Sequence, residues 1–389
     1  MHFLPAKDGD CFVLEMDNKD CIIIDCGYKV TYEKELKPLL LQLRDKGCRV
    51  ILLLITHIDM DHIGGTIRLL IENGDAGDPR VIPINNIWFN GFFNTLFRHP
   101  EFVRRRVKCL NAAMLRHRDA MLKELRMQAG EENGLISTTQ SISFEQLCIQ
   151  NGYRLNRHFA DAIVQRTSKN REAVLAAGIL LGDCHLFIIG PTIKQLENLA
   201  YKLNIEMIRR CGSDYQLTHD EPFGILFELL QMLHHNEQPI EEQEIAASGK
   251  RLENWLCTST MAPMNEINRA SIVLEIEYKG IRMLFCGDAD SADWADTIAP
   301  HYQLIKLSHH GSTKPNIPLI KKSRADILLI STNGGPNGRH PEDDLLARAI
   351  LAGNNALYFN YNIDRKSQLL DFQEKYGFSA RFNEREIGL

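Results

Sequence analysis

The sequence of 389 residues lacks any apolar run long enough to cross a lipid bilayer. Its N-terminal segment, MHFLPAKDGD, lacks the basic and then apolar pattern of a secretory signal. Its ten cysteines include no CxxC pair and no dense framework, so we expect reduced and mostly buried thiols rather than disulfides. These absences predict a soluble, cytoplasmic protein that does not associate with membranes.

The sequence also lacks an overall positive charge, because its formal net charge is −5. Any nucleic-acid-binding surface must therefore be local. Apolar residues make up 44% and charged residues 24% of the chain, which is typical of a globular protein. A chain of this length, without an internal repeat, can form two ordinary domains or one large domain with insertions.

The order of the predicted elements is typical of an α/β protein. Two strand-like segments, CFVLEM (11–16) and CIIIDCG (21–27), are followed by an amphipathic helix that ends at Gly47. The apolar segment VILLLI (50–55) then predicts a buried strand. Strands and helices in this order form layers of sheet and helix.

The most informative stretch is THIDMDHIGG, residues 56–65, directly after that strand. It contains four potential metal ligands, which are His57, Asp59, Asp61 and His62. We expect them on a loop, with Gly64 and Gly65 allowing a tight turn before a helix over residues 66–73. Imidazole and carboxylate groups bind divalent cations, and their alternation can direct them at two adjacent ions. A solvated Asp-rich turn is the alternative.

Three later strand-like segments also end in residues of metal-binding types. A hairpin is predicted over residues 271–290, and Asp288 follows its second strand. The segment YQLIKLSHHGS leads to His309 and His310, and ADILLISTNGGPNGRHP leads to His340. Repeated placement of such residues at strand ends indicates one site at one edge of a sheet.

Together, THIDMDHIGG, FCGDAD, LSHHGS and GRHP, with GDC and IIIDCG near the start, resemble the metallo-β-lactamase superfamily. More narrowly, they resemble the branch of the bacterial DNA-uptake competence proteins and the phosphorylcholine esterases. The matching segments cover roughly residues 1–90 and 263–350. The resemblance implies an αββα sandwich, in which helices flank two sheets and a two-metal site lies at one edge.

The resemblance also divides the chain into three parts. Residues 1–91 are expected to form the N-terminal half of the metallo-β-lactamase domain, and residues 263–389 its C-terminal half. Residues 92–262 are expected to be a mostly helical insertion, with some core elements around residues 179–204.

The resemblance further implies a ligand set for two ions. It places ligands of the first ion at His57 and Asp59, ligands of the second at Asp61, His62 and His340, and the bridging carboxylate at Asp288. The catalytic residues that it implies are Asp61, for the activated water, and His309 or His310, which completes the metal shell or protonates the leaving group. It implies supporting roles for Asp10, Asp25 and Asn268.

Two departures from the commonest superfamily pattern make the site richer in oxygen. Asp59 stands where that pattern has a histidine, and Asn268 stands about where another histidine is expected. The competence-type branch shares both features. Oxygen ligands favour Mn²⁺ or Mg²⁺ relative to Zn²⁺. We expect two divalent ions, Zn²⁺ or Mn²⁺, as cofactors.

Two-metal chemistry suits phosphodiesters, because the cations activate water and neutralise charge on a phosphoryl oxygen. We therefore expect a metal-dependent phosphodiesterase, and specifically a nuclease. One alternative is a small-molecule phosphodiesterase of the phosphorylcholine or cyclic-nucleotide type. Another is the catalytic subunit of a multi-protein bacterial defence or signalling complex, as in antiviral defence, with a partner protein bound by the insertion.

The insertion contains a local excess of positive charge. Residues 98–126 include nine basic and three acidic residues, which leaves a local charge of +6. We expect Arg104, Arg105 and Arg106 to contact a nucleic-acid backbone. The alternative is a solvated helix whose arginines pair with the acidic residues 237–244 or with a partner protein.

Overall fold

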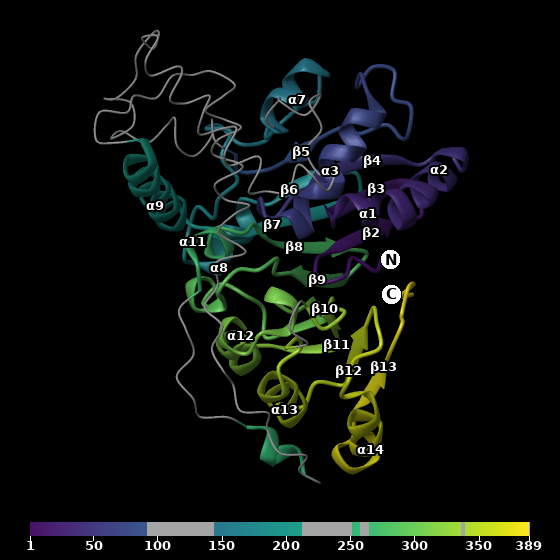
Figure 1. Ribbon diagram of the computed structural model, residues 1–389, viewed down its shortest axis with the longest axis vertical. Helices are drawn as coiled ribbons and strands as arrows, with labels where there is room; N and C mark the ends of the chain where they lie inside the picture. Colours follow the sequence, from purple (N-terminus) through teal and green to yellow (C-terminus); the bar gives the residue numbers. More distant parts are fainter. Residues whose placement is uncertain (92–143, 212–250, 257–263, 336–338, 389) are drawn as a thin grey trace.

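The computed structural model describes residues 1–91, 144–211, 251–256, 264–335 and 339–388. Two β-sheets lie against each other, and helices cover the outer face of each sheet (Figure 1). This arrangement of four layers confirms the αββα sandwich expected from the sequence. None of the helices in the described ranges combines the length and hydropathy of a membrane span.

The first sheet has the strand order β1-β2-β3-β4-β5. Its strands are β1 (His2–Phe3), β2 (Cys11–Glu15), β3 (Asp20–Cys26), β4 (Arg49–Leu54) and β5 (Ile87–Trp88). β2 is antiparallel to both of its neighbours, whereas β3, β4 and β5 run parallel. The parallel strands therefore end at one edge of the sheet.

The second sheet has the strand order β13-β12-β11-β10-β9-β8-β7-β6. Its strands are β6 (Ile179–Leu181), β7 (Cys184–Gly190), β8 (Val273–Tyr278), β9 (Ile281–Phe285), β10 (His301–Lys306), β11 (Arg324–Ile330), β12 (Ala356–Phe359) and β13 (Ser379–Arg381). β9 to β13 are parallel, and β6 to β9 are antiparallel. β6 and β7 extend this sheet, and they lie at residues 179–190, where core elements are expected within the insertion.

The helical segments lie on the outer faces of the sandwich and at its ends. Near the N-terminus, α1 (Lys29–Thr31), a π-helical segment (Tyr32–Leu36) and α2 (Lys37–Asp45) follow one another without interruption, and α3 (Met60–Asn73) follows β4. Further helices are α7 (Phe144–Gln150), α8 (Arg171–Ala176), α9 (Ile193–Cys211), α11 (Glu266–Arg269), α12 (Ile317–Lys322), α13 (Asp343–Leu351) and α14 (Lys366–Tyr376). Short 3-10 turns occupy Leu252–Trp255, Ser291–Asp293, His309–Gly311 and Lys314–Asn316.

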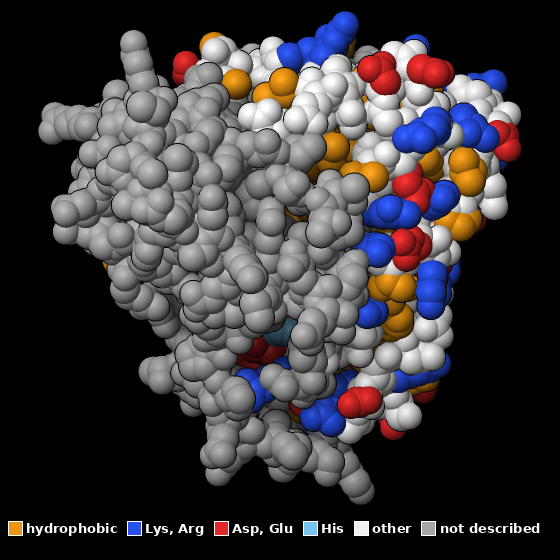
Figure 2. All heavy atoms as spheres, turned by 45° about the horizontal axis from the view of Figure 1, so that its top comes forward, with side chains coloured by type: hydrophobic (Ala, Val, Ile, Leu, Met, Phe, Trp, Pro, Cys, Tyr) orange, Lys and Arg blue, Asp and Glu red, His pale blue; other side chains and the backbone are white. Residues whose placement is uncertain are grey.

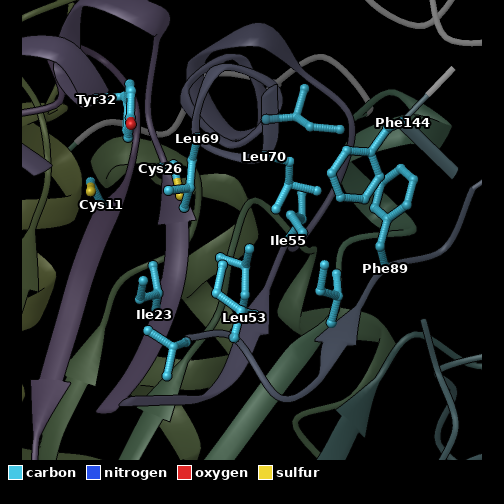
Figure 3. Packing of buried hydrophobic residues seen from close by; sticks show 14 of the residues in the cluster. Cys11, Ile23, Cys26, Tyr32, Leu53, Ile55, Leu69, Leu70, Phe89 and Phe144 are labelled. Atoms are coloured by element: carbon cyan, nitrogen blue, oxygen red, sulfur yellow. The ribbon is translucent and has the colours of Figure 1, made fainter. Parts of the chain in front are cut away.

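Clusters of buried apolar side chains lie between the layers. One joins the first sheet to α2 and α3 and includes Ile23, Leu53 and Leu69 (Figure 3). Another lies between the sheets. There the rings of Phe12 and Phe285 pack edge to face, with their centroids 5.4 Å apart. A further cluster joins the second sheet to α12, α13 and α14. Because the first sheet is covered on both faces, its strands β3 and β4 are apolar runs rather than alternating patterns.

The hairpin predicted over residues 271–290 is confirmed by the antiparallel pair β8 and β9. Its two turn residues, Lys279 and Gly280, have φ angles of 50° and 81°. Positive φ at both central residues is the geometry that matches the twist of the flanking strands.

The start of α3 differs from the expectation. The helix begins at Met60, so Asp61 and His62 lie in its first turn and not on a loop. The first turn of a helix favours an acidic residue such as Asp61, because the unpaired N–H groups there carry partial positive charge. The two ligand candidates are therefore held by a rigid element.

The predicted tight turn at Gly64 and Gly65 was wrong, because both glycines lie inside α3. Gly65 instead permits close packing between this helix and β3. A Cβ at this position would collide with the carbonyl oxygen of Cys26. The close approach of helix and strand therefore requires glycine, at a cost in helix propensity of about 1 kcal/mol relative to alanine.

Candidate metal centre

The candidate site lies where strands from both sheets end. Asp25 lies near the end of β3, and His57 follows β4, which is parallel to β3. Asp288 follows β9, and His310 follows β10, which is parallel to β9. Carboxyl ends of parallel strands lie at one edge of a sheet, which is where ligands bind in α/β proteins.

Asp288 lies at the centre of this site and is fully buried. Its Oδ1 is 3.6 Å from Nε2 of His62. Its Oδ2 is 3.3 Å from Nε2 of His310 and 3.9 Å from Nε2 of His57. One oxygen of Asp61 approaches two of these rings, at 3.3 Å from His310 Nε2 and 3.5 Å from His62 Nε2. Two carboxylates thus share one set of imidazoles.

Asp59, the remaining candidate ligand of residues 56–65, lies next to His57. It occupies the N-cap position of α3, but its side chain does not cap the helix. Its Oδ2 lies 3.4 Å from Nε2 of His57, and the residue is fully buried. The carboxylate therefore faces the cluster rather than the helix backbone.

Hydrogen bonds at Nδ1 set the orientation of the three central imidazoles. Nδ1 of His62 lies 2.7 Å from Asp25 Oδ2, and Nδ1 of His310 lies 3.1 Å from the carbonyl oxygen of Ser331. Both partners only accept, so each ring carries its proton on Nδ1. Nδ1 of His57 lies 3.1 Å from the hydroxyl of Thr56.

The hydroxyl group of Thr56 already donates its hydrogen to another residue. It donates to Asp25 Oδ2 at 2.7 Å, so it accepts from Nδ1 of His57. The tautomers of all three rings therefore leave Nε2 as the atom directed into the cluster. Such fixed tautomers are typical of histidines that bind metals.

The atoms that face the centre need a partner that the described residues do not provide. Nε2 of His57, His62 and His310 and both side-chain oxygens of Asp288 are buried without a hydrogen-bond partner. Ligand atoms of His57, His62 and Asp288 lie within 4.8 Å of one another, as do those of Asp61, His62 and His310. A divalent cation in each group would satisfy these atoms, so the residues fit a metal.

The net charge of the cluster also indicates that the site fits divalent cations. Five buried carboxylates belong to it, which are Asp10, Asp25, Asp59, Asp61 and Asp288. Among the residues that the structure describes, the buried ammonium beside them is that of Lys306. Five negative charges less one positive charge leave a net charge of −4 when the histidines are neutral. Two divalent cations carry the opposite charge, and buried charge without compensation is very unfavourable.

The pKa values of the site reflect this negative charge. Burial by itself lowers the pKa of His310, but Asp288 and Asp61 raise it to about 10. Burial also opposes the charged form of His62, yet the surrounding carboxylates, Asp61 first, hold its pKa well above the ordinary value. Despite burial, His310 and His62 hold the pKa of Asp288 well below its usual range. The site therefore attracts cations, and a bound metal would compete with these protons.

The two adjacent histidines lie in different parts of the site, with His310 at its centre and His309 at its more exposed rim. His310 belongs to the central group, whereas Nε2 of His309 is 3.9 Å from Asp288 Oδ2 and its side chain is 14% exposed. Asn268 Nδ2 and Ser312 Oγ each lie 3.3 Å from a ring nitrogen of His309. Asn268 therefore supports His309 and not the central ligands.

His340 lies outside both of the central groups. Its Nδ1 is 3.5 Å from Ser312 Oγ, and its ring centre is 5.7 Å from that of His309. The structure thus places it beside the rim histidine rather than among the atoms around Asp288.

Lys306 is a site residue that the sequence analysis did not identify. It is 1% exposed and forms an ion pair with Asp10. The sequence contained a sign of this role, because a lysine in the largely apolar segment YQLIKL must be paired if that strand is buried. Asp10 reaches the site because Gly9 packs on the carbonyl of Asp61, where a Cβ would collide.

Three residues of the site have left-handed backbone conformations. The φ angles are 54° at Asp25, 49° at His309 and 52° at His310. Such values are uncommon for residues other than glycine and are concentrated at functional sites. Here they turn the chain sharply at the strand ends, so that consecutive side chains reach different parts of the site.

Arg104, Arg105 and Arg106, like the acidic residues 237–244, lie outside the described residues. On the face in Figure 2, the Lys and Arg side chains of the described residues are interspersed with Asp and Glu. The visible described surface therefore has no extended patch of one sign. The local excess of positive charge remains a property of residues 98–126.

Comparison with known proteins adds one match. No curated protein matches the chain. Residues 4–112 match a family model, and this range includes β2 to β5, α3 and the motif at residues 56–65. The family is the metallo-beta-lactamase superfamily, whose members are typically hydrolases. The chain is thus similar to the metallo-beta-lactamase superfamily over residues 4–112.

Proposed function

We propose that this protein is a two-metal phosphodiesterase that cleaves nucleic acid. The observation that carries the proposal is the buried cluster around Asp288, in which three imidazole nitrogens converge on carboxylates. Its net charge of −4 matches two divalent cations. The resemblance of its motifs to the competence-protein and phosphorylcholine esterase branch supports a phosphodiester rather than a lactam.

The two groups of ligand atoms suggest which residues hold each ion. From the group of His57, His62 and Asp288, we assign His57 and Asp288 to the first ion, and we add Asp59 because it lies 3.4 Å from Nε2 of His57. Asp61, His62 and His310, which form the other group, would hold the second ion. Two bound cations supply a water of lowered pKa and neutralise charge on a phosphoryl oxygen. The large share of carboxylate ligands favours Mn²⁺, with Zn²⁺ as the other candidate.

A residue at the more exposed rim of the site would donate a proton to the leaving group. His309 lies next to the central cluster but is more exposed than His310. Asn268 and Ser312 hold its ring at both nitrogens. We therefore assign proton donation to the leaving oxygen to His309, and a ligand role to His310.

The choice of a nucleic acid over a small phosphodiester rests on residues 98–126 and their charge of +6. A polyanion gains binding energy from such a segment through release of its counterions, whereas a small phosphodiester neutralises few of these charges. We propose that Arg104, Arg105 and Arg106 contact the backbone of the substrate.

The test is a cleavage assay with metal-free protein and added Mn²⁺, Zn²⁺ or Mg²⁺. The substrates are labelled single- and double-stranded DNA and RNA, with bis(4-nitrophenyl) phosphate as the small phosphodiester. We expect Mn²⁺-dependent cleavage of a nucleic acid by the wild type and none by Asp288→Asn, with exposed Asp364→Asn as the active control. Cleavage of the small substrate alone would contradict the nuclease assignment. Elemental analysis that finds no metal, before or after addition, would contradict the proposal altogether.

A further inference from the structure

We propose that Lys306 is a positioning residue that serves as a permanent cation of the metal centre. It orients Asp10 and the loop that carries Asp288, and it leaves the cluster with a net charge of −4, which two divalent ions would balance. This inference rests on the proposed metal-dependent function and deepens it, because it assigns the group that prepares the site for its metals.

The contacts of Lys306 are those of a fixed group. It is the last residue of β10 and is 1% exposed. Its Nζ pairs with Asp10, donates to the carbonyl oxygen of Gly287 at 3.0 Å, and lies 3.8 Å from Asp288 Oδ1. The ammonium thus joins the N-terminal loop of the first sheet to the residue that precedes the central carboxylate.

Stability alone does not explain this buried ion pair. Burial of two charges costs so much desolvation that apolar residues in their place are often neutral or stabilising. The position of Asp10 suggests what the pair does. Asp10 Oδ2 lies 3.9 Å from Nδ1 of His62, and its Oδ1 lies 3.8 Å from Nδ1 of His310. Without Lys306, this carboxylate would compete with Asp25 and Ser331 for the hydrogen bonds that Nδ1 of His62 and His310 donate, and these bonds orient both rings.

Lys306 also limits the number of cation positions. Ligand atoms of Asp10, Asp25 and His62 form a third group within 4.8 Å of one another. Because the ammonium of Lys306 already pairs with Asp10, it neutralises the carboxylate that a third ion would need. The two groups around Asp288 then remain for the metals.

A double-mutant cycle separates this role from simple packing. The wild-type cluster has a net charge of −4, from five carboxylates and one ammonium. Lys306→Met makes the charge one unit more negative, and Asp10→Asn makes it one unit less negative. The double variant returns to the wild-type charge but lacks the hydrogen bond to Gly287. Exposed Lys322→Met is the control for loss of a positive charge elsewhere.

The measurements are Mn²⁺ binding by calorimetry on metal-free protein and the unfolding temperature without metal. We expect each single variant to bind Mn²⁺ about ten- to hundredfold more weakly, as for residues that support metal ligands. The double variant should recover most of that loss in affinity. Lys306→Met should also unfold at a lower temperature than the double variant, because it leaves a buried carboxylate without a partner.

Several outcomes would overturn the proposal. One is that either single variant binds Mn²⁺ as tightly as the wild type does. Another is that the double variant binds Mn²⁺ no more tightly than Lys306→Met does. If Lys306→Met does not fold, the Mn²⁺ affinity of Asp10→Asn decides, since there the ammonium lies unpaired 3.8 Å from Asp288. A wild type that binds no Mn²⁺ would instead refute the metal-dependent function. The cycle in unfolding temperature would still report whether Lys306 and Asp10 are coupled.

Discussion

Asp25 and His62 form a buried hydrogen bond of 2.7 Å between Oδ2 and Nδ1. The same carboxylate accepts the backbone N–H of Thr56 at 2.8 Å and its hydroxyl at 2.7 Å. Because Thr56 in turn holds Nδ1 of His57, one carboxylate at the end of β3 orients two histidines of the motif. Asp25 therefore links the first sheet to the ring geometry of the metal centre.

We expect Asp25→Asn to weaken Mn²⁺ binding about ten- to hundredfold without unfolding the protein. The amide of asparagine cannot accept from all three donors, so the His62 ring loses the bond that fixes its tautomer. Titration calorimetry on metal-free protein measures the change. The matched variant is Asp364→Asn on the surface, and equal affinities for the two variants would contradict the assigned role of Asp25.

His309 and His310 are expected to differ when each is replaced by alanine. His310→Ala removes an Nε2 that lies 3.3 Å from both Asp61 and Asp288, so metal content and hydrolysis should fall together. His309→Ala should retain its metal and slow turnover by a factor on the order of 10² to 10⁴, as for loss of a proton donor. Elemental analysis beside initial rates distinguishes the two. Loss of metal from His309→Ala would make that residue a ligand.

The two neighbouring glycines of α3 offer a matched test of the packing. Gly65→Ala places a methyl group against the carbonyl of Cys26 and should cost roughly 1–3 kcal/mol of unfolding free energy, as overpacking does. At Gly64, the nearest atom to an added Cβ is the flexible Met60 methyl at 3.1 Å. Gly64→Ala should therefore be neutral or stabilise by up to about 1 kcal/mol through helix propensity. Urea denaturation of the metal-free proteins measures both, and equal effects would contradict the close-packing explanation.

Replacement of Arg104, Arg105 and Arg106 by glutamine should weaken nucleic-acid binding and reduce its dependence on salt. Each arginine that neutralises a phosphate releases a counterion, so its loss flattens the slope of affinity against salt concentration. Hydrolysis of bis(4-nitrophenyl) phosphate should be unchanged, because so small a substrate does not need the insertion. Gel shifts across a salt series provide the measurement. Identical binding by wild type and variant at every salt concentration would exclude these arginines from the interface.

Much of the fold follows from local patterns in the sequence. VILLLI predicts a buried strand because both faces of β4 are covered, and positive φ at Lys279 and Gly280 follows from a two-residue hairpin turn. The placement of His57 and Asp288 also follows from the sequence, since each lies just beyond a strand end, and Asp61 and His62 follow in the first turn of the next helix. Parallel strands present such residues at one edge whatever the loops between them.

Other features depend on contacts between distant segments. The sequence shows two adjacent histidines, but only the left-handed backbone at His309 and His310 decides which ring enters the cluster. Likewise, β7 extends the second sheet by pairing with β8, about ninety residues further along the chain. Local propensity does not encode the register of such a pair, because the partner strand supplies its hydrogen bonds and its buried face.

The sequence by itself determined the layered α/β architecture, the strand-end placement of the metal-binding residue types and the excess of acid at the site. Tertiary structure decided that α3 begins at Met60, that Gly65 serves helix packing, and that Lys306 meets Asp10 across nearly three hundred residues. The physical reason is that periodicity and composition report the environment that a residue needs. The partner that satisfies a buried charge is selected only when remote strands are brought to the same edge.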